Sequence, residues 1–426
     1  MIKIYDAEEF EAERNERRPA SGRITADVAD IISNVVKRGD DALREYTEKF
    51  DGCELERFEL PGSALDDAAE GVGSEFIGVM ERAAENIKSF HRRQIRSDFI
   101  MTPGDGIILG QRILPLGKVG VYIPGGTAAY PSSVLMNCIP AKLAGVGEII
   151  MATPPSRGNR DNKGILAAAK IAGVDRVFSI GGAQAIAAFA YGTQTVPKVD
   201  KITGPGNAYV AEAKRQVFGV VGIDMIAGPS DIIVIADGRA DPALVAADML
   251  SQCEHGEDSA ATLITDSAEL AGQVGMQLDA QVRQLPRMST ALEAIDRNSK
   301  IIIVKSIGRA FEISNELAPE HLEIFLAEPL KYLDKVQNAG SVFLGENTPE
   351  VLGDYCAGPN HTLPTSGTAR FSSPLSVDDF IKKSSFTYYS GDALKRTAGD
   401  VVRFAEAEGL TAHARSVISR IEENKK

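Results

Sequence analysis

The chain has 426 residues, more than one hydrophobic core usually holds, so we expect at least two large domains. Hydrophobic residues make up 44% and charged residues 25%, an ordinary balance for a globular protein in water. The net charge of −13 argues against a nucleic-acid partner, because phosphate binding requires a basic surface.

The cysteines, Cys53, Cys138, Cys253 and Cys356, form no CxxC pair. This spacing predicts neither a zinc knuckle nor a redox dithiol, and so few cysteines in a long chain are typical of reduced thiols. The first residues, MIKIYDAEEFEAERNERR, lack the apolar core of a signal peptide, and no stretch has the length of a membrane span. We therefore expect a cytoplasmic protein without a membrane partner.

The N-terminal part predicts helices. Residues 1–20 are rich in charge and predict an exposed arm, in the simplest case a solvated helix. Ile24–Phe50 and Glu75–Arg96 follow with the periodicity of amphipathic helices, so each has one face to bury.

From Lys118 onward, apolar strands alternate with helices. KVGVYIP, EIIMAT, RVFSIGG and KVDKIT predict strands, the segments between them predict helices, and the polar stretch Pro154–Gly164 predicts a loop. Such alternation is typical of a parallel sheet with helices on both faces. We assign residues 118–231 to one α/β domain, with a nucleotide as its expected ligand.

The same alternation resumes after this domain, with predicted strands at DIIVIAD, TLIT, KIIIVK, HLEIFL and SVFLG. Asp241 and Pro242 predict the start of a helix, since Asp caps helices and Pro fits their first position. We assign residues 232–372, together with residues 21–117, to a second domain. The predicted fold class is α/β, with two Rossmann-like domains of mostly parallel sheets, one inserted in the other.

Beyond residue 372 the alternation stops. Val377–Phe386 and Leu394–Arg420 predict helices, so residues 373–426 predict a helical C-terminal tail. Apolar residues at helical spacing, such as Val401 and Phe404, indicate that this tail packs against a surface.

Most of the histidines lie near carboxylates or amides. They occur in QCEH (252–255), in PEH (319–321), as His361 after Asp354, and as His413 after Glu408. Histidine is the commonest metal ligand and the usual proton carrier near neutral pH. We interpret the pattern as one site built from distant segments, against the alternative of isolated surface histidines.

Gln252 and His255 lie three residues apart near the end of the helix predicted over 242–255. That spacing places both side chains on one helix face, within reach of a single ion. The alternative is a polar helix end at which His255 meets the terminal carbonyls. Glutamine is an unusual zinc ligand, so the pair alone is a weak indication. Cys253 is expected to be a small buried residue rather than a nucleophile.

Two further segments carry candidate chemistry. GDYCAGPNHTLPT predicts a loop that presents Asp354 to a cleft, unless Asp354 only makes a local turn bond. Glu320 and His321 precede the predicted strand HLEIFL and so lie at a sheet end, where α/β enzymes place their sites. Glu can activate water and His can take a proton from an alcohol. Adjacent strand residues point to opposite faces, so the two need a bend to share a substrate.

Three glycine turns follow strands, in VYIPGGTAAYPSS, SIGGAQAIAA and ITGPGNAYVAEAK. Free backbone N–H groups at the helix starts could hold a phosphate. Three such turns in one sheet predict a ligand-binding edge. The alternative is tight strand–helix packing that merely requires glycine.

Together these motifs closely resemble the histidinol dehydrogenase family of zinc-dependent enzymes. The resemblance is carried by VYIPGG, GGAQAIAA, TGPGNAYV, AGPSD, SQCEHG, APEHLEI, GDYCAGPNHTLPT and EGLTAH, which span nearly the whole chain. It implies two successive NAD-linked oxidations in the last step of histidine biosynthesis. L-histidinol becomes L-histidinaldehyde, water adds, and the hydrate becomes L-histidine.

The resemblance also implies site residues. The zinc ligands would be Gln252, His255, Asp354 and His413, the last from the other subunit of a domain-swapped homodimer. His321 would deprotonate the alcohol and Glu320 would activate the water. The substrate would be held by the zinc ligands, by this acid/base pair, and by Ser230, His361 and Glu408. Contacts to NAD would come from Tyr122, Gln184 and Asn207.

Three alternatives are consistent with the same residues. A dehydrogenase of the same fold could act on another amino or sulfonated alcohol, although the presence of Glu408 and His413 favours histidinol. A zinc hydrolase could use Glu320 and activated water without NAD. The third alternative is a metal-binding protein without catalysis.

Overall fold

The computed structural model describes residues 2–13, 22–125, 130–155 and 162–423. The chain divides into two compact units, Met1–Gln94 with Leu116–Phe380, and Ile95–Pro115 with Ile381–Lys426. Within the described ranges, none of the helices has the length and apolar character needed to cross a membrane.

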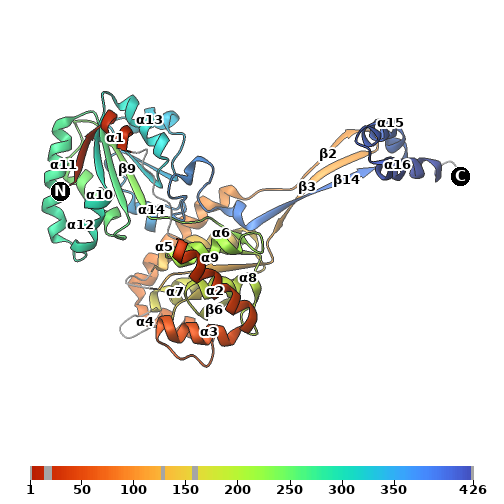
Figure 1. Cartoon of the computed structure of the whole chain (residues 1–426), viewed down its shortest axis with the longest axis horizontal. Coiled ribbons are helices and arrows are strands. Elements are labelled where there is room, and N and C mark those ends of the chain that lie inside the picture. The colour runs from red at the N-terminus through yellow and green to blue at the C-terminus, as the bar shows by residue number, and fades with distance from the viewer. Residues whose placement is uncertain (1, 14–21, 126–129, 156–161, 424–426) are drawn as a thin grey trace. The chain divides into compact units, whose positions relative to one another are not determined.

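The first unit contains a six-stranded parallel sheet. Its spatial order is β1 (Lys3–Asp6), β11 (Lys300–Ile303), β10 (Ala260–Thr265), β9 (Asp231–Ala236), β12 (His321–Phe325) and β13 (Ser341–Leu344). Both faces of β9 are buried, which explains the continuous apolar run of residues 232–236. β12 is also buried throughout, although its sequence includes His321 and Glu323. One face packs on α10 (Pro242–Cys253), α11 (Ala268–Gln281) and α12 (Met288–Arg297), the other on α1 (Ala7–Glu13) and α13 (Ile307–Leu317) (Figure 1).

The same unit contains a five-stranded parallel sheet. Its order is β6 (Arg176–Ser179), β5 (Glu148–Thr153), β4 (Lys118–Tyr122), β7 (Lys201–Thr203) and β8 (Gly222–Ile223). One core contains α2 (Gly22–Arg38), α3 (Asp40–Tyr46), α8 (Gly182–Tyr191) and α9 (Ala208–Val217). The other contains α4 (Ser63–Val72), α5 (Ser74–His91), α6 (Pro131–Ala144) and α7 (Lys163–Ala172). The two sheets confirm the predicted α/β class.

The N-terminal segments pack differently from the predicted grouping. Helices within residues 21–117, which the sequence places with residues 232–372, instead cover the five-stranded sheet, where Leu43 and Ile87 are fully buried. Periodicity shows that a helix has a face to bury, but not which sheet buries it. In the predicted arm 1–20, β1 is an edge strand paired with β11 and Phe10 is buried, while residues 14–20 lie outside the described ranges.

The second unit is an antiparallel ribbon joined to two helices. The strands run in the order β14 (Ile381–Tyr389), β3 (Ile107–Pro115) and β2 (Phe99–Gly104), followed by α15 (Gly391–Ala407) and α16 (Thr411–Glu423) (Figure 1). The N–H of Ser390 donates to the carbonyl of Gly106 at 2.7 Å, and its hydroxyl caps α15. The predicted tail is therefore helical except at β14, because pairing with a strand distant in sequence outweighs local helical spacing.

The candidate site residues lie at opposite strand ends in the two parallel sheets. In the five-stranded sheet, the carboxyl ends of β4, β6 and β7 lead into glycine turns. In the six-stranded sheet, the amino ends of β9 and β12 follow Ser230 and Glu320. Since all strands within each of these two sheets are parallel, residues at the same strand end lie along one edge of the sheet.

Candidate active site

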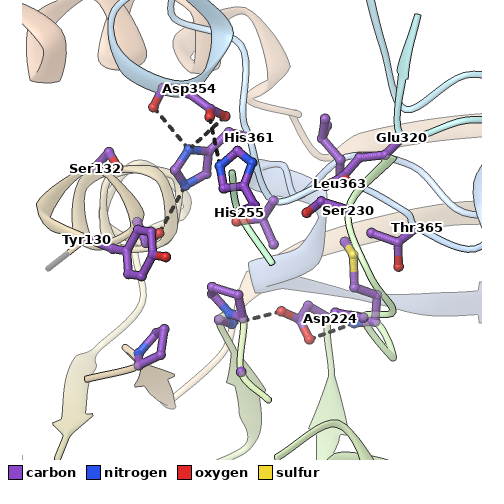
Figure 2. Close-up of a pocket in the computed structure, with 18 of the residues that line it drawn as sticks. Tyr130, Ser132, Asp224, Ser230, His255, Glu320, Asp354, His361, Leu363 and Thr365 are labelled. Atoms are coloured by element: carbon purple, nitrogen blue, oxygen red, sulfur yellow. Dashed lines mark hydrogen bonds and ion pairs between the residues drawn. The ribbon is translucent and has the colours of Figure 1, made fainter. Parts of the chain in front are cut away.

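A cavity of about 450 Å³ in the first unit is lined by segments from both parallel-sheet domains (Figure 2). It brings together most of the predicted site residues, namely Asn207, Ser230, His255, Glu320, His321, Asp354 and His361. Among the described residues, the lining does not include Tyr122, Gln184 or Gln252. The predicted convergence of distant segments is therefore observed for the larger part of the set.

Asp354 lies close to two histidines, His255 and His361, whose rings face it in Figure 2. His255 follows α10, and its Nε2 atom lies 3.9 Å from Oδ2 of Asp354. Nδ1 of His361 lies 3.6 Å from Oδ1 of Asp354 and donates to its backbone carbonyl at 3.0 Å. Asp354 stands on the short helix α14 (Val351–Tyr355), where the sequence predicts only a loop.

Asp354 is held as a carboxylate by its neighbours. Burial acts to raise its pKa, but the interactions with His361, and then with His321 and His255, outweigh burial, and the pKa of Asp354 is lowered. A carboxylate with a low pKa beside imidazoles is able to bind a cation at neutral pH.

Gln252 lies in the last turn of α10 and is fully buried. Neither its Oε1 nor its Nε2 atom has a hydrogen-bond partner among the described residues. A buried amide without a partner costs free energy, and such groups in native structures usually serve a ligand or a bound water. Cys253, the next residue, is also fully buried, as the sequence predicts.

Glu320 and His321 are both held by the backbone of Asp231 on the neighbouring strand β9. The N–H of Asp231 donates to Oε2 of Glu320 at 3.1 Å, and Nδ1 of His321 lies 3.2 Å from the carbonyl oxygen of Asp231. A carbonyl can only accept, so Nδ1 carries the proton and Nε2 of the neutral ring is left as an acceptor. Oε2 of Glu320 lies 3.8 Å from Nδ1 of His321. Glu320 precedes the strand, which supplies the bend that lets adjacent residues share a site.

Burial moves the pKa values of this pair in opposite directions. It lowers the pKa of His321 to about 4, so the imidazole is neutral near pH 7. Burial, followed by the charge of Asp231, raises the pKa of Glu320 well above its ordinary value. The pair therefore combines a neutral imidazole with a carboxyl group of increased basicity, which suits two different proton transfers.

Glu350 is a candidate metal ligand that the sequence does not predict. It is fully buried, its Oε1 accepts from the hydroxyl of Ser251 at 2.7 Å, and its Oε2 has no partner among the described residues. One potential ligand atom from each of His321, Glu350 and Asp354 lies within 4.8 Å of the others. Burial, then the charge of Asp354, raises the pKa of Glu350 to about 7. Its position one helical turn before Asp354 is the signal that could have found it.

The residues predicted to contact a nucleotide belong to the five-stranded sheet and its helices. The hydroxyl of Tyr122 accepts from the N–H of Gly182 at 3.0 Å. Gln184 is buried, and neither amide atom has a partner within the described ranges. Oδ1 of Asn207 accepts from two N–H groups of the first turn of α9, both at 3.1 Å. The first predicted glycine turn extends into residues 126–129, which lie outside the described ranges.

Glu408 and His413 belong to the second unit. Glu408 follows α15, and His413 lies in the first turn of α16, with both side chains exposed. Their contribution to a shared site stays a prediction.

Comparison with known proteins identifies the family of the chain. The sequence model of the histidinol dehydrogenase family matches residues 14–421. Histidinol dehydrogenase from Clostridium acetobutylicum is 52% identical over 408 residues, which cover 96% of this chain and 95% of the relative. The enzyme of the same name from Listeria innocua is 54% identical over 404 residues, covering 95% and 94%. A crystal structure of histidinol dehydrogenase from Elizabethkingia anophelis matches with a TM-score of 0.93 at 38% identity, covering 100% and 99%. The chain therefore belongs to the histidinol dehydrogenase family, NAD-dependent oxidoreductases that catalyse the final step of histidine biosynthesis.

Proposed function

We propose that this chain oxidises L-histidinol to L-histidine through L-histidinaldehyde in the cavity of Figure 2, with two molecules of NAD. The observation that carries the proposal is that Glu320, His321 and Asp354, which belong to distant segments, line one cavity. Membership of the histidinol dehydrogenase family supports the choice of substrate.

Zinc is part of this proposal. Nε2 of His255, an oxygen of Asp354 and the amide oxygen of Gln252 are nitrogen and oxygen donors that zinc accepts, and that manganese or cobalt also accept. The unpartnered amide of buried Gln252 fits such a role. We expect His413 of the partner subunit to complete the ligand set in a homodimer. When bound, zinc would orient the amine and imidazole of histidinol and balance charge.

His321 is the base that we assign to the alcohol step. Its Nδ1–H donates to the carbonyl of Asp231, so Nε2 is available to accept the hydroxyl proton. When bound, NAD would supply the hydride acceptor. Because burial lowers the pKa of His321 to about 4, the ring is unprotonated and ready to act near neutral pH.

Glu320 is the base that we assign to the second step, in which water adds to the aldehyde. Its raised pKa makes the ionised carboxylate a stronger base than an ordinary glutamate. Ser230, His361 and Glu408 would hold polar groups of the substrate. Two bases with different proton affinities in one cavity suit an enzyme that oxidises an alcohol and then retains the reactive aldehyde.

The test is the stoichiometry of the purified, zinc-loaded protein. Two molecules of NADH should form for each L-histidinol consumed, and activity should disappear on chelation and return with zinc. A ratio near one, or no turnover, would contradict the proposal. Asp354→Asn should reduce zinc affinity by more than about 10-fold, measured by equilibrium dialysis, because it removes a charged ligand.

Sharing of the site between subunits has its own test. His413→Asn should weaken zinc binding, and mixed dimers of this variant with an inactive His255→Ala variant should recover part of the activity. One of the two sites in such a dimer can contain both native histidines. Verified heterodimers without any recovery would argue that each site is built from one chain.

A further inference from the structure

A buried ion pair lies at the cavity beside the turn that connects β7 to α9. The ammonium group of Lys214, on α9, contacts the carboxylate of Asp224, which follows β8, and their side chains are only 2% and 1% exposed. Both residues line the cavity, and Figure 2 shows Asp224 with its contacts drawn. Neither residue belongs to the acid/base pair or to the proposed zinc ligands.

The ion pair holds Gly204 at both of its backbone groups. Oδ2 of Asp224 accepts from the N–H of Gly204 at 2.8 Å, and Nζ of Lys214 donates to the carbonyl of Gly204 at 2.9 Å. Gly204 has φ +110°, and a Cβ there would lie 2.0 Å from the carbonyl oxygen of Tyr122. The turn therefore starts in a conformation that only glycine adopts easily, and two opposite charges hold it there.

The same turn ends at Asn207, the residue with an expected NAD contact. Asn207 caps α9, and Lys214 lies on that helix, so the ion pair links the start of the turn to the helix that follows it. A shift at Gly204 would displace Asn207 and the neighbouring backbone N–H groups that line the cavity.

A role in stability alone does not explain this arrangement well. Removing two charges from water is costly, and well-packed apolar residues of similar volume often stabilise a core equally or better. A charged pair has another property, because it can fix the directions of both the backbone N–H and the backbone carbonyl of one residue, here Gly204. That property is useful where a turn must be preorganised for a ligand.

We propose that the Lys214–Asp224 ion pair positions the turn of residues 204–207 for the dinucleotide, and that it determines NAD affinity without taking part in hydride transfer. This inference rests on the proposed function, since it requires NAD to bind beside Asn207. Lys214 and Asp224 are positioning residues that act through Gly204.

The experiment is a double variant, Lys214→Met with Asp224→Asn. Changing both residues avoids an uncompensated buried charge, which would endanger folding, and the introduced asparagine keeps an oxygen for the N–H of Gly204. Calorimetric titration of the folded protein with NAD should give a Kd raised by about tenfold or more, with kcat at saturating NAD within about twofold of wild type. An unchanged Kd, or a loss confined to kcat, would overturn the inference.

A control pair of the same residue types lies beside the same sheet and is more exposed, at 35% and 39% against 2% and 1%. Lys142 on α6 contacts Asp175 at 2.8 Å, and Asp175 accepts from the N–H of Ile149 at 2.7 Å, near the amino end of β5. The double variant Lys142→Met with Asp175→Asn removes a pair of the same chemistry outside the cavity lining. Its Kd for NAD should match wild type, and an equal loss in both double variants would show a general effect of charge rather than positioning.

Two single variants complete the test. If the first double variant does not fold, Lys214→Arg retains the charge but changes its reach, and the folded variant should show a Kd for NAD raised several-fold. An unchanged Kd in folded Lys214→Arg then contradicts the inference.

Asn207→Ala separates the two proposals: if it weakens NAD binding but the ion-pair variants do not, only the inference fails. If Asn207→Ala also leaves the Kd unchanged, the proposed location of NAD fails.

Discussion

The two walls of the cavity differ in chemistry. The ionisable wall, His255, Glu320, His321, Asp354 and His361, comes from the amino edge of the six-stranded sheet and from nearby helix ends. The glycine wall, residues 124–125 and 204–207, comes from the carboxyl edge of the five-stranded sheet. One wall contains side chains with shifted pKa values, whereas the other presents backbone groups and a neutralised ion pair. Proton transfer requires the first kind of surface and dinucleotide binding the second, so substitutions in the two walls should change different quantities.

The largest effect is expected from Glu320→Gln in the ionisable wall. The amide keeps the shape of the side chain but cannot take a proton from water, so oxidation of the aldehyde should fall by about 10²–10⁴-fold. Oxidation of histidinol itself should fall less, because we assign that step to His321. The measurement is NADH formation from histidinol and, separately, from histidinaldehyde supplied directly.

Affinity for NAD provides the internal control for this variant. Glu320 lies in the ionisable wall, whereas NAD is expected to bind at the glycine wall, so the Kd for NAD should stay at the wild-type value. Normal turnover of supplied histidinaldehyde would refute the role of Glu320, and a large change in NAD affinity would show that the two walls are not separable.

The second expected effect is on stability, from Glu350→Gln in zinc-free protein. Burial, then Asp354, raises the pKa of Glu350 from 4.5 to about 7, so the folded chain binds this proton more tightly than the unfolded chain does. The resulting stability is complete below the unfolded pKa and is lost as pH rises through about 7, a loss that glutamine avoids. The variant should therefore gain stability over wild type with rising pH, by at most about 3 kcal/mol.

Urea unfolding at about pH 5 and about pH 8 measures this difference. Zinc is the natural control, since a cation near Asp354 favours the ionised form of Glu350 and should make the difference smaller. A stability difference that does not depend on pH in zinc-free protein would show that Glu350 titrates normally.

The two walls also differ in how far the sequence predicts them. Strand–helix alternation predicts β4 to α9 well, because most elements there are local apolar runs followed by glycine or proline. The ionisable wall is predicted residue by residue through the resemblance, but Glu350 and the supporting Asp231 are not, because their roles depend on contacts between segments distant in sequence. The same limit explains β14, whose partner β3 lies far away along the chain. Local pattern determines elements, whereas pairing and burial of isolated charges depend on the whole fold.

A smaller effect is expected in the glycine wall, from Asn207→Ala. The variant loses the cap of α9, which costs about 1 kcal/mol of stability, and should raise the KM for NAD while kcat at saturation changes little. Ser267→Ala is the matched control, since Ser267 caps α11 by accepting from the N–H of Leu270 at 3.2 Å and lies outside the cavity lining. Equal effects of both variants on KM would show that Asn207 matters only to its helix.

The smallest effect is expected from Cys253→Ala, which defines the limit of the ionisable wall. Cys253 follows Gln252 on α10, but its side chain is fully buried and its Sγ atom lies 3.6 Å from Oγ of Ser299. Burial raises the pKa of the Cys253 thiol to about 11, so the thiolate needed for nucleophilic attack is scarce at neutral pH. Both steps should proceed within about twofold of wild type, at a stability cost of about 1 kcal/mol.

Labelling with iodoacetamide should modify the exposed Cys356 and spare Cys253 in the folded protein. A loss of aldehyde oxidation in a folded Cys253→Ala variant would show that the thiol takes part in the mechanism and that Cys253 belongs to the ionisable wall.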